Sequence, residues 1–72
     1  MKLYLDCEYN DFRGPLISLA LVTEDGRTFY ESVGCENPSK WVAENVMPVI
    51  NKVAISKSQL SFGLATFLHN LR

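Results

Sequence analysis

Histidine and cysteine are scarce in this 72-residue chain, and neither residue type forms a metal-binding pattern. There is one histidine, and the two cysteines, Cys7 and Cys35, are far apart in the sequence. Their spacing matches no zinc motif, and because no secretory segment precedes them we expect both thiols to be reduced. Cys7 lies among apolar residues, where a free cysteine behaves as a small hydrophobic side chain.

The chain also lacks an excess of either charge and a long apolar run. Seven basic and eight acidic residues give a net charge of −1, and the basic residues are spread along the sequence. This pattern argues against an electrostatic nucleic-acid clamp, but it is compatible with an enzyme that holds phosphates through metal ions. No apolar stretch is long enough to span a bilayer and no signal pattern is present, so we expect a cytoplasmic protein with no membrane partner. Residues 1–72 are near the lower size limit of a single domain.

Three segments have the composition of strands. Residues 2–9 alternate in polarity, residues 16–23 are almost uniformly apolar, and residues 27–33 follow an Asp-Gly pair that is typical of a hairpin turn. We expect a three-stranded antiparallel sheet with residues 16–23 at its centre, buried on both faces.

Two helices are predicted after the sheet, which gives an α+β fold class. Asn37 and Pro38 are typical of a helix start and Pro48 disfavours helix in the residue before it, so the first helix is expected at about 38–47, with Trp41 as a packing anchor. The second is expected at 57–71, because Ser56 and Gln59 fit a capping box. Its apolar stripe should pack against the sheet; the stripe is Leu60, Leu64, Phe67, Leu68 and Leu71.

Asp6 and Glu8 are the candidate metal ligands. Side chains alternate across a strand, so both carboxylates point to one face, with Cα atoms roughly 6.5 Å apart. Acids are disfavoured in strands, and two on one face repel each other unless a cation neutralises them. Mg²⁺ or Mn²⁺ suits such oxygen ligands, so the pair predicts a divalent metal site. The alternative is that both acids are simply solvated.

The order of these elements resembles the start of a ribonuclease H-like nuclease domain. Leu5-Asp6-Cys7-Glu8 resembles the first motif of the DEDD-type 3′-5′ exonucleases. The run from Leu16 to Val22, the following Glu24-Asp25-Gly26-Arg27 and the Trp41-Val42 helix resemble a bacterial and phage branch typified by a mycobacterial 3′-5′ exoribonuclease. The resemblance spans the chain but covers only the opening part of the family's domain.

The resemblance implies metal-dependent phosphodiester hydrolysis at the 3′ end of single-stranded RNA or DNA. Asp6 and Glu8 would be its catalytic and metal-binding residues, with Mg²⁺ or Mn²⁺ as cofactor. The family's second aspartate, histidine and third aspartate come from elements later than Arg72, so we expect the 72-residue chain to be inactive or weakly active. Asp11, Asp25 and His69 are in the wrong order to replace them.

Two other expectations stay open. The chain could be a non-catalytic protein-interaction module, or an inactive truncated relative of the exonuclease family.

In the family fold the first strand is internal, whereas in this chain it would be an edge that pairs with a second copy or a complementing chain. A two-fold dimer across that edge would bring two Asp6-Glu8 pairs together, and divalent ions would then favour association.

Overall fold

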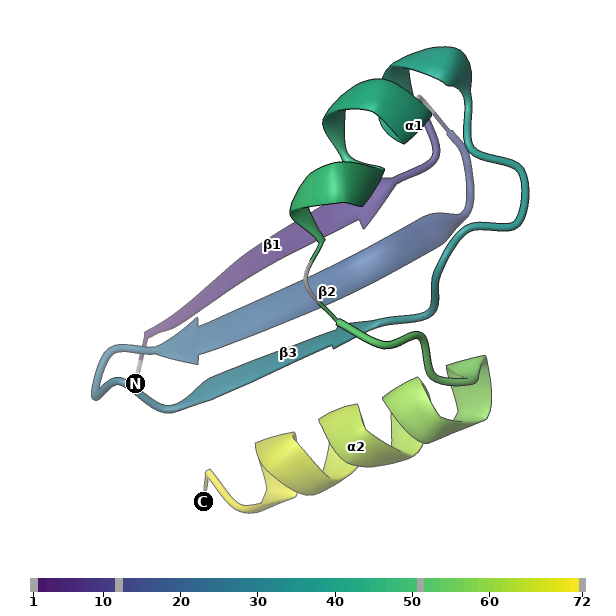
Figure 1. The fold of residues 1–72 in the computed structure, drawn as a ribbon. Coiled ribbons are helices and arrows are strands. Elements are labelled where there is room, and N and C mark those ends of the chain that lie inside the picture. The colour runs from purple at the N-terminus through teal and green to yellow at the C-terminus, as the bar shows by residue number, and fades with distance from the viewer. Residues whose placement is uncertain (1, 12, 51, 72) are drawn as a thin grey trace.

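The computed structural model describes residues 2–11, 13–50 and 52–71, and it has the predicted α+β architecture (Figure 1). One antiparallel sheet is followed by helices. The strands are β1 (Leu3–Tyr9), β2 (Leu16–Thr23) and β3 (Thr28–Ser32). The helices are α1 (Lys40–Asn45), a short 3-10 helix η1 (Met47–Val49) and α2 (Lys57–His69). No helix in these described ranges is long and apolar enough to cross a membrane.

The sheet order is β1-β2-β3, so β2 is the central strand as predicted. The Asp-Gly hairpin is confirmed: the backbone N–H of Thr23 donates to the carbonyl of Arg27 (2.9 Å), and Gly26 adopts a φ of 92° that glycine accommodates without strain. Most of β2 is buried or half-buried, but Val22 is 39 % exposed, so the strand is not covered on both faces along its whole length.

The first helix begins later and ends earlier than predicted. Ser39, not Asn37, is its N-cap: the Ser39 hydroxyl accepts a hydrogen bond from the Val42 N–H. The Asn10 side chain accounts for the shift, because it donates to the Asn37 carbonyl and accepts from the Ser39 N–H, both at 2.8 Å. The Ser39 backbone is extended (φ −60°, ψ 163°), so the helix begins at Lys40.

The core lies between β2 and the α1–η1 segment. Ile17, Val42 and Val46 are buried together, and Met47 and Ile50 pack against them. Val42 and Val46 are one helical turn apart, which aligns them on the inner face of α1. Trp41 points away from this face and is 62 % exposed, so the expectation that it anchors the packing is wrong.

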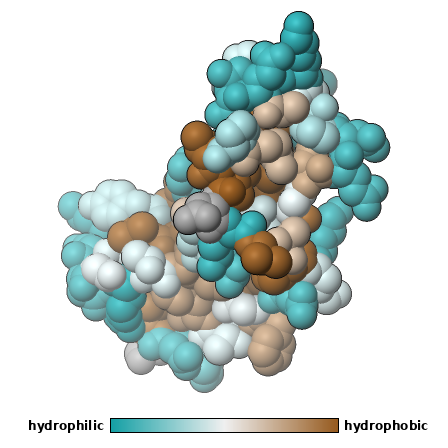
Figure 2. All heavy atoms as spheres, viewed as in Figure 1, coloured by the Kyte–Doolittle hydropathy of each residue, from teal (hydrophilic) through white to brown (hydrophobic). Residues whose placement is uncertain are grey.

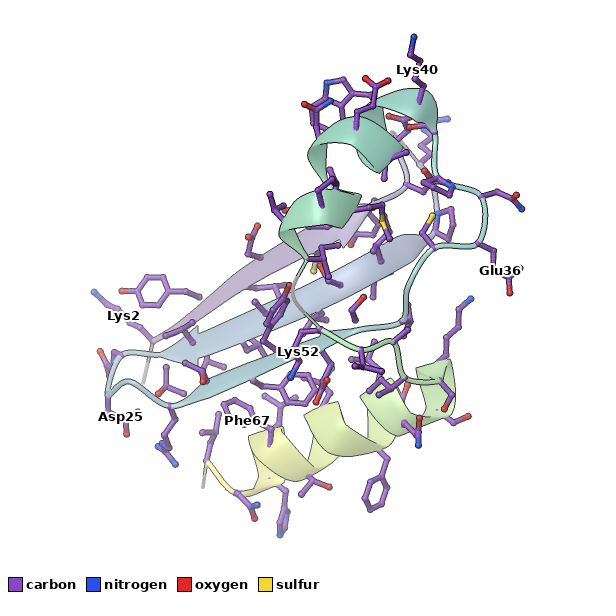
Figure 3. All side chains as sticks on the ribbon, viewed as in Figure 1. Lys2, Asp25, Glu36, Lys40, Lys52 and Phe67 are labelled. Carbon is purple, nitrogen blue, oxygen red and sulfur yellow. The ribbon has the colours of Figure 1, made fainter. Side chains whose placement is uncertain are left out.

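Helix α2 lies alongside β3 (Figure 1). Its N-terminus has the predicted capping box, in which Ser56 and Gln59 each accept from the other's backbone N–H. Phe67 points toward the sheet and packs on Phe29, with ring centroids 5.7 Å apart (Figure 3). The apolar stripe is thus partly buried against the sheet, as expected, although Leu68 remains 41 % exposed.

The segment before α2 runs along the outer edge of β3. The Ile55 N–H donates to the Ser32 carbonyl (2.8 Å), and Ala54 forms a parallel bridge with Ser32. The described part of this segment, residues 52–55, therefore contributes to the sheet, and Asn51 lies outside the described residues.

Candidate metal site

Asp6 and Glu8 lie on one face of β1, and the sheet register defines their neighbours. Asp6 pairs with Ala20, and Ala20 pairs with Tyr30 on β3. In the next row Glu8 pairs with Ser18. Cross-strand partners point to the same face, so the carboxylates share a surface with Tyr30. Asp6 is exposed and Glu8 is half-buried.

The two acids border a pocket of about 250 Å³. Ala20 and Ser18 form its floor, and because their side chains are small they leave space that larger residues would fill. Val49 and Ile50, at the end of η1, form its wall on the helical side. Figure 2 shows brown apolar atoms in the middle of the molecule, where this segment crosses the sheet. The pocket therefore combines two carboxylates with apolar walls.

No cation neutralises the acid pair within the described ranges: neither the Asp6 nor the Glu8 carboxylate takes part in any ion pair or hydrogen bond found there. Lys52 is close to the pocket, with its ammonium 5.9 Å from the centroid of the Tyr30 ring, but it pairs with Glu31 at 3.5 Å. Figure 3 shows Lys52 over the sheet, between η1 and α2. The carboxylates are therefore available to a cation, and the Lys52 side chain lies near Tyr30, one of the residues that line their pocket.

The other acids and the histidine do not complete a metal site. Asp25 lies in the β2–β3 hairpin, where it accepts from the Thr23 hydroxyl and pairs with Arg27 at 3.0 Å. The Arg27 and Thr23 hydrogen bonds lower the pKa of Asp25 to about 2. His69 lies in the last turn of α2, which packs against Phe29, on the sheet face opposite to Tyr30. Among the described residues no group of three or more histidine, cysteine, aspartate or glutamate side chains could hold a metal ion.

A larger pocket of about 380 Å³ lies elsewhere, between the β1–β2 loop, the segment after β3 and the start of α2. It contains neither Asp6 nor Glu8, and its charged lining residues are Glu36 and Lys57. We place the candidate site in the smaller pocket, because only there do carboxylates converge on one surface.

Sequence reasoning located both acids but missed their neighbours, above all Tyr30, Val49 and Ile50. Tyr30 could have been found: the Asp-Gly hairpin fixes the β2–β3 register, which places Tyr30 opposite Ala20. Val49 and Ile50 could not, because their position depends on how the 3-10 turn at Pro48 folds back over the sheet.

A scan against protein-family models and a search of curated proteins both found no match to this chain.

Proposed function

We propose that this chain is the first part of a DEDD-type 3′-5′ exonuclease domain of the ribonuclease H-like superfamily, and that it contributes the first carboxylate motif to metal-dependent phosphodiester hydrolysis. The observation that carries the proposal is the position of Asp6 and Glu8 on one face of β1, beside a pocket and without a cationic partner among the described residues. Two unneutralised carboxylates on one strand face favour a divalent cation.

Asp6 and Glu8 are the residues that would hold Mg²⁺ or Mn²⁺. Such an ion, when bound, polarises the phosphate and lowers the pKa of a water ligand. Hard cations prefer six or more oxygen ligands, so two side chains alone bind weakly and the 72-residue chain hydrolyses RNA feebly or not at all. Tyr30 lies on the same face as the acids. The Lys52 ammonium lies over the Tyr30 ring, 5.9 Å from its centroid, and would contact the phosphate of a bound nucleotide by leaving Glu31.

The test is metal-dependent binding of a nucleoside 5′-monophosphate, the product that 3′-end hydrolysis releases. Amide resonances of the chain are followed by NMR with adenosine 5′-monophosphate in Mg²⁺ and again in EDTA. We expect shifts around Glu8, Ala20 and Tyr30 in Mg²⁺ that disappear in EDTA and in the Asp6→Asn/Glu8→Gln double variant. A matched control, Glu44→Gln on the exposed side of α1, should leave the shifts unchanged. Shifts that persist in EDTA, or that centre on the larger pocket, would overturn the proposal.

A second candidate function is a non-catalytic protein-interaction module in the cytoplasm. Two observations favour it: the described residues offer no third metal-binding side chain near the acids, and β1 is an edge strand. For this module we expect no metal-dependent binding of the nucleotide, so the same NMR experiment separates the two functions.

A further inference from the structure

The outer edge of β1 is free of backbone partners in the described part of the chain. Among residues 2–11, 13–50 and 52–71, β1 pairs only with β2, and no other backbone hydrogen bond reaches Leu3, Leu5 or Cys7. The opposite edge of the sheet is different, because the Ala54–Ile55 segment bonds to Ser32 there. The two edges of the sheet are therefore not equivalent, and β1 provides the available one.

The register shows which backbone groups of β1 point outward. The backbone groups of odd-numbered β2 residues form hydrogen bonds with β3, as the Thr23–Arg27 and Ile17–Val33 bonds show. Its even-numbered residues therefore bond to β1, where the Glu24 N–H donates to the Lys2 carbonyl. The backbone groups of Leu3, Leu5 and Cys7 consequently face away from the sheet.

The side chains at the same three positions form an apolar row. They lie on the sheet face opposite to Asp6, and α2 covers that face only beside β3. Leu3 is 45 % exposed and Leu5 is 63 % exposed. An edge that combines outward amides with exposed leucines is a template for another strand.

We propose that a second copy of this chain pairs with β1 in antiparallel orientation, with Leu5 facing its own counterpart across a two-fold axis. Leu3 then lies opposite Cys7 of the second copy, and Cys7 lies opposite its Leu3. This register uses all three outward-facing positions as hydrogen-bonded pairs. If the register shifts by two residues in either direction, only two of these three positions face each other. The third then lies opposite a residue outside the set.

Charge complementarity supports this register. On the other face, Lys2 lies opposite Glu8 of the second copy, and Asp6 lies opposite Tyr4. Two symmetric Lys2–Glu8 pairs form, and opposite charges in directly facing positions stabilise a sheet. A shift of two residues in one direction brings Asp6 opposite Asp6 and places like charges together. The same shift in the other direction pairs Lys2 with Asp6, but it leaves Cys7 outside the apolar pairs and places no residue opposite Glu8, so the Glu8→Lys variant separates that register from the proposed one. The dimer therefore neutralises Glu8 with Lys2, and it forms without divalent ions.

Charge exchange tests the register. Sedimentation velocity over a concentration series in EDTA should show a monomer–dimer equilibrium for the unaltered chain. Lys2→Glu or Glu8→Lys alone converts two favourable pairs into two unfavourable ones, and we expect each to raise the dimer Kd about tenfold or more. The Lys2→Glu/Glu8→Lys double variant restores the pairs and should recover the original Kd. The exposed Lys40→Glu variant on α1 is the matched control and should have no effect.

Cross-linking gives an independent readout. In a Cys7→Ser/Cys35→Ala background, Leu5→Cys places two thiols opposite each other at about 5.5 Å between Cα atoms, which a disulfide can span. Oxidation should give a covalent dimer, whereas Leu3→Cys in the same background should give little. Circular dichroism confirms that each variant is folded. A folded chain that remains monomeric at high concentration would overturn the proposal. Equal cross-linking at positions 3 and 5 would also overturn it. So would a Lys2→Glu/Glu8→Lys variant that fails to restore association.

Discussion

Ile17 is the residue on which the packing of α1 and η1 against the sheet depends most. It is fully buried and contacts the cluster of Val42 and Val46. Truncation to alanine removes buried methyl and methylene groups and leaves a cavity, which costs about 2–5 kcal/mol, whereas Ile17→Val costs about 0.5–1.5 kcal/mol. A domain of this size has a free energy of unfolding of about 4–11 kcal/mol, so Ile17→Ala removes a large part of it.

Urea denaturation followed by far-ultraviolet circular dichroism measures these differences. Val53→Ala is the matched control: Val53 is 87 % exposed, so its truncation should change the free energy of unfolding by less than about 0.5 kcal/mol. The Ile17 series should rank as alanine, then valine, then the unaltered chain, in order of rising stability. If Ile17→Ala were as stable as Val53→Ala, the core described here would be refuted.

Three further outcomes follow from local geometry. Ser56→Ala removes the hydroxyl that accepts from the Gln59 N–H, so it should lower the free energy of unfolding by about 0.5–2 kcal/mol. Urea denaturation measures this difference, and an unchanged free energy of unfolding would count against the cap. The lowered pKa of Asp25, about 2, means that its contribution to stability is present above pH 4 and is lost as the pH falls from about 4 to about 2. Carboxyl NMR titration should show this low midpoint, and Arg27→Gln should raise it; an unshifted midpoint in the variant would contradict the assigned cause. Gly34 has a φ of 73° and an added Cβ would lie 3.1 Å from the Ala54 Cβ, so Gly34→Ala should destabilise the chain by about 1–2 kcal/mol in thermal or urea unfolding, and a neutral result would argue against this turn.

The sheet could be predicted from the sequence because its signals are local. The uniformly apolar run at Leu16–Thr23, the Asp-Gly turn and the alternation around Asp6 each act over a few residues, and all three strands begin and end within one residue of their predicted bounds. The capping box of α2 is equally local and was also correct.

The start of α1 depends on contacts that sequence patterns do not carry. Asn37 and Pro38 are a good local start signal, but the Asn10 side chain bridges Asn37 and Ser39 across the sheet end and moves the cap to Ser39. Trp41 is exposed because a helix of only six residues buries one narrow face, and Val42 and Val46 already occupy it.

The candidate site also has one part that sequence patterns predict and another part that depends on tertiary packing. The common face of Asp6 and Glu8 follows from strand alternation alone, and the hairpin register adds Tyr30. The wall formed by Val49 and Ile50 requires the path of the chain over the sheet, which depends on tertiary packing.

Manganese titration tests most directly whether Asp6 and Glu8 form a metal site. Amide signals of the chain are recorded by NMR as Mn²⁺ is added in small steps, and paramagnetic broadening reports proximity to the ion. We predict that broadening begins at Asp6, Cys7 and Glu8 and at their β2 partners, that excess Mg²⁺ reverses it, and that Asp6→Asn/Glu8→Gln abolishes it. Broadening that centres on Glu36 or on the β2–β3 hairpin, or that is the same in the double variant, would contradict the metal site.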